Sequence, residues 1–139
     1  GESIRVFNNG KMSRDFTYID DVLEAIIKCC YKPPTKNDFF DKRTPDPSSS
    51  FAPFKILNVG NNKVVELMYF IKLLEKNFDK KAIIQFEPLQ DGDVISTYAD
   101  LNEIKKWINF SPSTSIEKGI EKFSKWYINY FYNQDKNND

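Results

Sequence analysis

The sequence predicts an α/β fold, a small mixed sheet with flanking helices, folded as a single domain. The chain has 139 residues, of which 40% are hydrophobic and 15% aromatic, enough for one domain with its own core. Short stretches in which polar and apolar residues alternate predict strands. Between them lie segments whose apolar residues follow helical spacing, and this alternation of the two patterns is typical of an α/β fold.

The predicted strands are short and end at turn residues. Strands are predicted over residues 3–7, 16–19, 54–59 and 82–86. The first is followed by Asn8-Asn9-Gly10, residue types that tolerate positive φ. The loop 88–93 contains the turn Asp91-Gly92.

Helices are predicted over residues 20–30, 64–77, 101–108 and 114–130. Asp20 and Asp21 suit the cap and first turn of the first helix, where exposed N–H groups favour carboxylates. Thr114 and Glu117 form a predicted capping box for the last helix.

The segment 33–53 is predicted to be a long mobile loop. It holds five prolines and a run of three serines, and its apolar residues have no periodicity. Phe39, Phe40 and Phe51 are expected to pin parts of it down. The polar tail 133–139 is expected to fray.

Composition excludes several function classes. The chain has 20 basic and 20 acidic residues, so it lacks the basic excess typical of nucleic-acid or membrane-surface binding. Histidine is absent, which excludes His-dependent triads and zinc sites with a His ligand. The five glycines form neither a G-x-G-x-x-G nor a Walker A loop, and we predict no metal site.

The cysteines and the hydropathy indicate a cytoplasmic protein. Cys29 and Cys30 are adjacent, a strained arrangement for a disulfide, and are predicted to be small buried hydrophobes that stay reduced. No apolar run approaches the about 18 residues that a membrane span needs.

One long motif and three shorter ones support a resemblance. Residues 6–21 read VFNNGKMSRDFTYIDD. The shorter segments are Asn58-Val59-Gly60-Asn61 with Val65-Glu66-Leu67-Met68, Gln90-Asp91-Gly92-Asp93-Val94, and Phe110-Ser111-Pro112 with Gly119-Ile120 and Trp126-Tyr127. In this order and spacing they resemble the C-terminal part of nucleotide-sugar epimerases of the extended short-chain dehydrogenase/reductase family, most closely UDP-glucuronate 4-epimerases. The resemblance covers almost the whole chain except residues 35–53.

The resemblance implies the substrate-binding portion of an extended Rossmann-type enzyme. Family members bind NAD on an N-terminal half through a glycine fingerprint and catalyse with a Tyr-x-x-x-Lys pair; they oxidise and reduce C4 of the sugar. Here the fingerprint is missing, and the Tyr-x-x-x-Lys match, Tyr132 with Lys136, sits in the predicted tail. We therefore expect the NAD-binding half to be absent, no catalytic residue in this chain, and a complete enzyme that is a homodimer. The strand around 55–59 is expected to join the edge of the larger sheet.

By the same resemblance, Arg14 would hold the UDP diphosphate, which a guanidinium can bind with paired charged hydrogen bonds. The alternative for Arg14 is a surface pair with a carboxylate. Lys11 is a weaker candidate, expected to be solvated.

Three further residues would contact UDP. Phe7 would lie against the uracil or, alternatively, pack in the core. Asp93 would accept hydrogen bonds from the ribose or, alternatively, cap its turn. Gln90 stands where UDP-galactose epimerases carry an arginine, which favours the glucuronate group. Asp20, Asp21 and Asn58 are assigned no chemistry.

Other readings remain open. The chain could belong to another UDP-sugar epimerase, decarboxylase or dehydratase of the same family. It could also be a non-catalytic UDP-sugar-binding or assembly module.

Overall fold

The computed structural model describes residues 2–132 and divides the chain into two compact units. Unit 1 comprises residues 1–16, 63–98 and 114–139, and unit 2 comprises residues 17–62 and 99–113. The expectation of a single domain stays a prediction. The predicted tail 133–139 and the pair Tyr132–Lys136 lie outside the described side chains.

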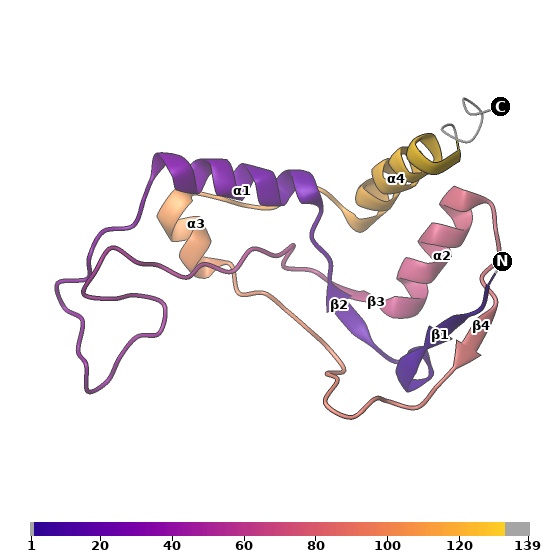
Figure 1. Ribbon diagram of the computed structural model, residues 1–139, viewed down its shortest axis with the longest axis horizontal. Helices are drawn as coiled ribbons and strands as arrows, with labels where there is room; N and C mark the ends of the chain where they lie inside the picture. The colour runs from indigo at the N-terminus through magenta and orange to yellow at the C-terminus, as the bar shows by residue number, and fades with distance from the viewer. Residues whose placement is uncertain (1, 133–139) are drawn as a thin grey trace. The chain divides into compact units, whose positions relative to one another are not determined.

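Unit 1 contains four short strands in two sheets, which Figure 1 shows as two separate ribbon pairs. Strand β1 (Ile4–Val6) pairs in parallel with β4 (Ile84–Phe86). Strand β2 (Ser13–Asp15) pairs antiparallel with β3 (Val64–Glu66). The α/β class is confirmed, but the parallel and antiparallel pairings of the predicted mixed sheet are divided between two ladders.

The turn after β1 confirms the conformational prediction for Asn8-Asn9-Gly10. These residues form the short 3-10 turn η1 (Phe7–Gly10), with Asn8, Asn9 and Gly10 at φ of 50°, 51° and 77°. A Cβ on Gly10 would lie 2.7 Å from the sulfur of Met68. Only glycine therefore fits both the backbone and the space at this position.

The helices of unit 1 pack on each other. Helix α2 (Leu67–Phe78) lies against α4 (Ile116–Tyr127), and α4 continues into a π-helical turn, η2 (Ile128–Tyr132). Phe78 and Tyr127 meet edge to face at 5.5 Å between ring centroids. The Tyr69 hydroxyl donates a 2.8 Å hydrogen bond to Glu117, which ties the first turns of the two helices together and raises the pKa of Tyr69.

Unit 2 is built on helices α1 (Ile19–Tyr31) and α3 (Asn102–Ile108). Its core is a cluster of Ala25, Leu101, Ile104 and Phe110, against which Leu57 and Val59 pack. The buried carboxylate of Asp21 accepts hydrogen bonds from the amide and hydroxyl of Ser113. Asp20 and Asp21 lie in the first turn of α1, as predicted, but the N-cap is Tyr18, whose side chain makes no capping hydrogen bond. The bonds to Ser113 give Asp21 a structural role different from the predicted cap.

Several predicted boundaries are wrong. The strand predicted at 16–19 lies at 13–15, because Ser13, Arg14 and Asp15 are the residues in register with β3, a strand that the sequence analysis missed. Residues 54–59 form no strand; Lys55 makes an isolated bridge with Ser49. An extended segment becomes a strand only with a hydrogen-bonded neighbour.

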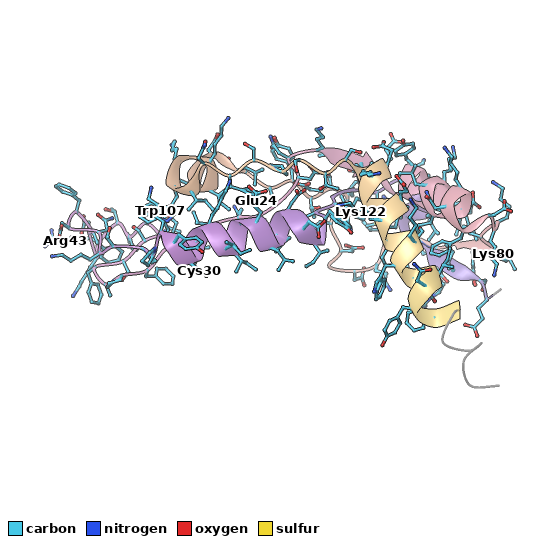
Figure 2. The ribbon with its side chains drawn as sticks, turned by 90° about the horizontal axis from the view of Figure 1, so that it is seen from above. Glu24, Cys30, Arg43, Lys80, Trp107 and Lys122 are labelled. Carbon is cyan, nitrogen blue, oxygen red and sulfur yellow. The ribbon has the colours of Figure 1, made fainter. Side chains whose placement is uncertain are left out.

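Two local predictions are also corrected. The last helix is capped by Ser115, whose hydroxyl accepts from the Lys118 amide at 3.3 Å, and not by Thr114. Both cysteines were predicted to be buried, but Cys29 is only half-buried and Cys30 is exposed near the C-terminal end of α1 (Figure 2). It lies on a helix face that nothing in the described chain covers, so periodicity alone could not predict its burial.

The segment 33–53 is irregular, as predicted. The Asn37 amide donates to the Ser50 carbonyl, and the rings of Phe40 and Phe51 lie 6.0 Å apart, whereas Phe39 is exposed. The predicted mobility of this loop remains untested. Among residues 2–132, no helix has the length and apolar character needed to cross a bilayer.

Candidate functional site

The candidate site is centred on Arg14, the middle residue of β2. Antiparallel pairing places Arg14 opposite Val65 and fixes the backbone beneath the guanidinium. Nη1 donates to the main-chain oxygens of Ser13 and Ile95, at 2.8 and 3.2 Å. Nη2 donates to Oδ1 of Asp93 at 3.0 Å, forming an ion pair. These bonds use three of the five N–H donors of a guanidinium.

Asp93 is positioned by a tight turn. The amide of Asp93 donates to the Gln90 carbonyl at 3.2 Å, and Gly92 adopts φ of +82° between them. Oδ1 of Asp93 also accepts from the Val94 amide at 2.8 Å. The carboxylate is therefore oriented by its own backbone as well as by Arg14.

Residues 93–97, here named the strap, run beside β2. The Ser13 amide donates to the Ile95 carbonyl at 2.9 Å, and the hydroxyls of Ser13 and Ser96 are 2.9 Å apart. The Asp15 amide lies 3.3 Å from Oγ1 of Thr97. This contact was not predictable from the sequence, because a parallel bridge between residues more than 80 positions apart leaves no local sequence signal.

Of the other predicted site residues, Gln90 contacts the Arg14–Asp93 site, whereas no contact with that pair is recorded for Phe7 or Lys11. The Gln90 side chain is exposed, and the residue joins the site through its carbonyl. Phe7 is half-buried on η1, and the Arg5 guanidinium lies 5.5 Å from its ring centroid. This is within the range of a cation–π contact, and the half-buried ring leaves both alternatives for Phe7, the uracil contact and core packing, as predictions. Lys11 is exposed, as expected.

The arrangement of Arg14 and Asp93 can bind a ligand. Arg14 offers donors to an anion and Asp93 offers acceptors to hydroxyl groups. Both side chains are partly exposed, at 26% and 32%. Among the described residues, no three acidic or cysteine side chains gather as metal ligands would. The chemistry available here is recognition of a ligand that carries both negative charge and hydroxyls.

Comparison with known proteins identifies relatives along most of the chain. No family model matches. Protein CapI of Staphylococcus aureus is 43% identical over 94% of this chain, and a probable UDP-glucuronate 4-epimerase of Rhizobium meliloti is 39% identical over 91%. The chain is a relative of the C-terminal part of UDP-glucuronate 4-epimerases.

Solved structures confirm the fold of this epimerase relative. The crystal structure of UDP-glucuronic acid 4-epimerase from Bacillus cereus in complex with NAD has a TM-score of 0.67 at 23% identity, over 94% of this chain and 35% of that one. UDP-glucose 4-epimerase from Bifidobacterium longum, solved with NAD⁺ and UDP, has a TM-score of 0.70 at 16% identity. The chain spans less than two-fifths of the length of the CapI and Rhizobium relatives.

Proposed function

We propose that this chain is the UDP-sugar-binding portion of an NAD-dependent epimerase that interconverts UDP-glucuronate and UDP-galacturonate. One observation carries the proposal: the motif arginine Arg14 and the loop acid Asp93, 79 residues apart in sequence, meet in one partly exposed site. The name of the Rhizobium meliloti relative, a probable UDP-glucuronate 4-epimerase that is 39% identical, supports the same substrate class.

The residues of this chain would hold the nucleotide while the sugar reacts. The guanidinium of Arg14 neutralises diphosphate charge, and Asp93 accepts hydrogen bonds from ribose hydroxyls. Phe7 offers a ring face to the uracil, and Gln90 lines the turn that carries Asp93. Fixing UDP in this way orients the sugar ring without taking part in proton or hydride transfer.

We infer that the described residues, 2–132, do not bind NAD. Among residues 2–132, two glycines have positive φ. The position that a Cβ of Gly10 would occupy lies against the side chain of Met68, and Gly92 lies in a turn that leads into the strap. Neither opens a helix, which is where a dinucleotide pyrophosphate binds. In this proposal NAD, which accepts and returns the C4 hydride, is bound by residues outside this chain.

The exposed apolar face of α1 supports the proposal that this chain is part of a larger protein. Ile19, Leu23, Ile26 and Ile27 form one apolar stripe, and each is about half exposed within the described chain. An uncovered stripe of this kind marks a contact surface. We attribute its cover to the remainder of the protein, which we also propose to be a cytoplasmic homodimer; light scattering of the complete natural protein tests the dimer.

Calorimetric titration of the complete natural protein with UDP tests the site. Removing one partner of a desolvated charge pair costs about 2–5 kcal/mol, and partial exposure places Arg14 at the low end. Arg14→Ala is therefore expected to weaken UDP binding by about ten- to a hundredfold. Asp93→Asn, which keeps its size and some hydrogen bonding, should weaken it less.

Lys11→Ala is the matched control, because an exposed lysine contributes at most about 1 kcal/mol. If Arg14→Ala binds UDP as tightly as the unaltered protein, Arg14 is a structural residue and the site assignment is wrong. The 139-residue chain alone should convert no UDP-glucuronate with added NAD⁺. Steady formation of UDP-galacturonate, followed by chromatography, would contradict that expectation, whereas UDP binding by a complete protein that lacks all turnover would favour a binding module.

A further inference from the structure

The groups proposed to bind the diphosphate and the ribose of UDP bind each other in this structure. Nη2 of Arg14 and Oδ1 of Asp93 are 3.0 Å apart. A diphosphate that binds the two remaining N–H donors of Arg14 therefore lies beside a carboxylate of the same charge. The consequence of that repulsion depends on which other groups the ligand carries.

The arginine is anchored independently of this ion pair. Its Nη1 bonds to the carbonyls of Ser13 and Ile95 join β2 to the strap, and both acceptors belong to the backbone. An incoming anion can thus bind the remaining N–H donors without reorienting the guanidinium. The arginine is presented in one geometry with and without ligand.

The carboxylate is also held at a second point. Oδ1 of Asp93 accepts from the Val94 amide at 2.8 Å, so the side chain stays beside Arg14 when the ion pair opens. Oδ2 accepts no hydrogen bond from any residue among 2–132 that the structure records. It is the oxygen available to donors on a ligand.

Resting on the proposed function, we propose that Asp93 makes the site selective for nucleoside diphosphates over simple phosphates. A bare pyrophosphate on Arg14 would place its negative charge beside the Asp93 carboxylate and offer that carboxylate no hydrogen-bond donor of its own. A nucleoside diphosphate places the same charge there but supplies ribose hydroxyls, which can donate to Oδ2 of the carboxylate. Asp93 thus attracts a nucleoside diphosphate through its ribose hydroxyls and repels a simple phosphate that lacks such donors.

Titration calorimetry of the complete natural protein with UDP and with pyrophosphate, without divalent cations, tests this selectivity. Asp93→Asn keeps the shape of the side chain and removes its charge. Pyrophosphate binding is expected to strengthen by about threefold, the size typical of a partly exposed ion pair. UDP binding is expected to weaken, because the ribose loses a charged acceptor. The ratio of the two dissociation constants should therefore narrow; an unchanged or wider ratio would overturn the proposal.

Asp91→Asn is the matched control. Asp91 is an exposed acid two residues away in the same loop, so this variant removes an equal charge without removing the bond to Arg14. The ratio should stay as in the unaltered protein. Equal narrowing in both variants would assign the selectivity to the charge of the loop and overturn the role of Asp93. If the unaltered protein does not bind UDP, or Arg14→Ala binds it normally, the proposed function fails, and the inference fails with it.

Discussion

Helices α1 and α2 carry the same kind of amphipathic pattern but meet different surroundings. In unit 1, α2 turns its apolar residues toward α4, and Phe70 stacks on Phe16 at 4.4 Å between ring centroids. In unit 2, the side of α1 that packs holds Asp21 and Ala25, whereas the apolar stripe of α1 is exposed. Periodicity thus indicates that a helix has an apolar face, but the covering element depends on the rest of the protein.

The two helices also end differently. After α2, Asp79 adopts a left-handed conformation, and the Glu75 carboxylate accepts from the Ala82 amide at 2.9 Å. After α1, the chain enters Pro33-Pro34 and the long irregular loop. The end of α2 is therefore hydrogen-bonded to the segment that leads into β4, whereas α1 is followed by an irregular loop.

The largest expected effect is a difference in the free energy of unfolding between alanine variants of the two apolar faces. Ile71 on α2 is 6% exposed and Ile26 on α1 is 52% exposed. Truncating a buried isoleucine costs about 2–5 kcal/mol, so Ile71→Ala should lower the free energy of unfolding by that amount. Ile26→Ala in the 139-residue chain should change it by about 0.5 kcal/mol or less.

The same two variants in the complete natural protein test whether its remaining part covers the apolar face of α1. If the remainder of the protein covers α1, Ile26→Ala should then cost more than about 1 kcal/mol, while the cost of Ile71→Ala stays the same. Denaturant unfolding measures both. An equally small cost for Ile26→Ala in both proteins would show that the α1 face stays uncovered.

A smaller effect concerns the chain after each helix. Limited digestion with trypsin should cut first in the loop after α1, at Lys36, Lys42 or Arg43, because few contacts oppose local opening there. Lys80 and Lys81, which follow α2, should be cut later. Mass spectrometry of the first fragments identifies the sites. First cleavage inside 67–78 would show that the mobile region has been misplaced.

The smallest effect is the pH dependence of the end of α2. The Ala82 amide and then Lys81 hold the pKa of Glu75 below its ordinary value of 4.5. A lowered pKa contributes stability above pH 4.5, and this contribution is lost as the pH falls through the folded-state pKa. Glu75→Gln should thus lower Tm by a constant amount at about pH 6 to 8, and the difference should shrink below about pH 4.5.

Lys81→Met gives the matched contrast for Glu75. It removes the lesser cause of the shift and keeps the bond to the Ala82 amide, so its Tm effect near neutral pH should be smaller than that of Glu75→Gln. Thermal unfolding at about pH 3 to 8, followed by circular dichroism, measures the Tm differences of both variants from the unaltered protein. A Tm difference for Glu75→Gln that grows in acid would contradict the assignment.

Local chemistry made much of this structure predictable. The turn at Asn8-Asn9-Gly10 was predictable because few residue types adopt positive φ. Helices α1, α2 and α3 lie close to their predicted ranges because their apolar residues recur at helical spacing. The candidate site residues Arg14 and Asp93 were predictable only from the resemblance, since neither lies in a pattern that composition or spacing alone would single out.

The sequence by itself determined the helices, the tight turns and the relationship to epimerases, because these depend on neighbouring residues or on motifs read in order. Tertiary structure decided the register of β2 against β3, the failure of residues 54–59 to form a strand, and the bond between Arg14 and Asp93. Each of these depends on a partner distant in sequence. A strand exists only where another backbone supplies its hydrogen bonds, and an arginine has a defined role only once its carboxylate partner is known.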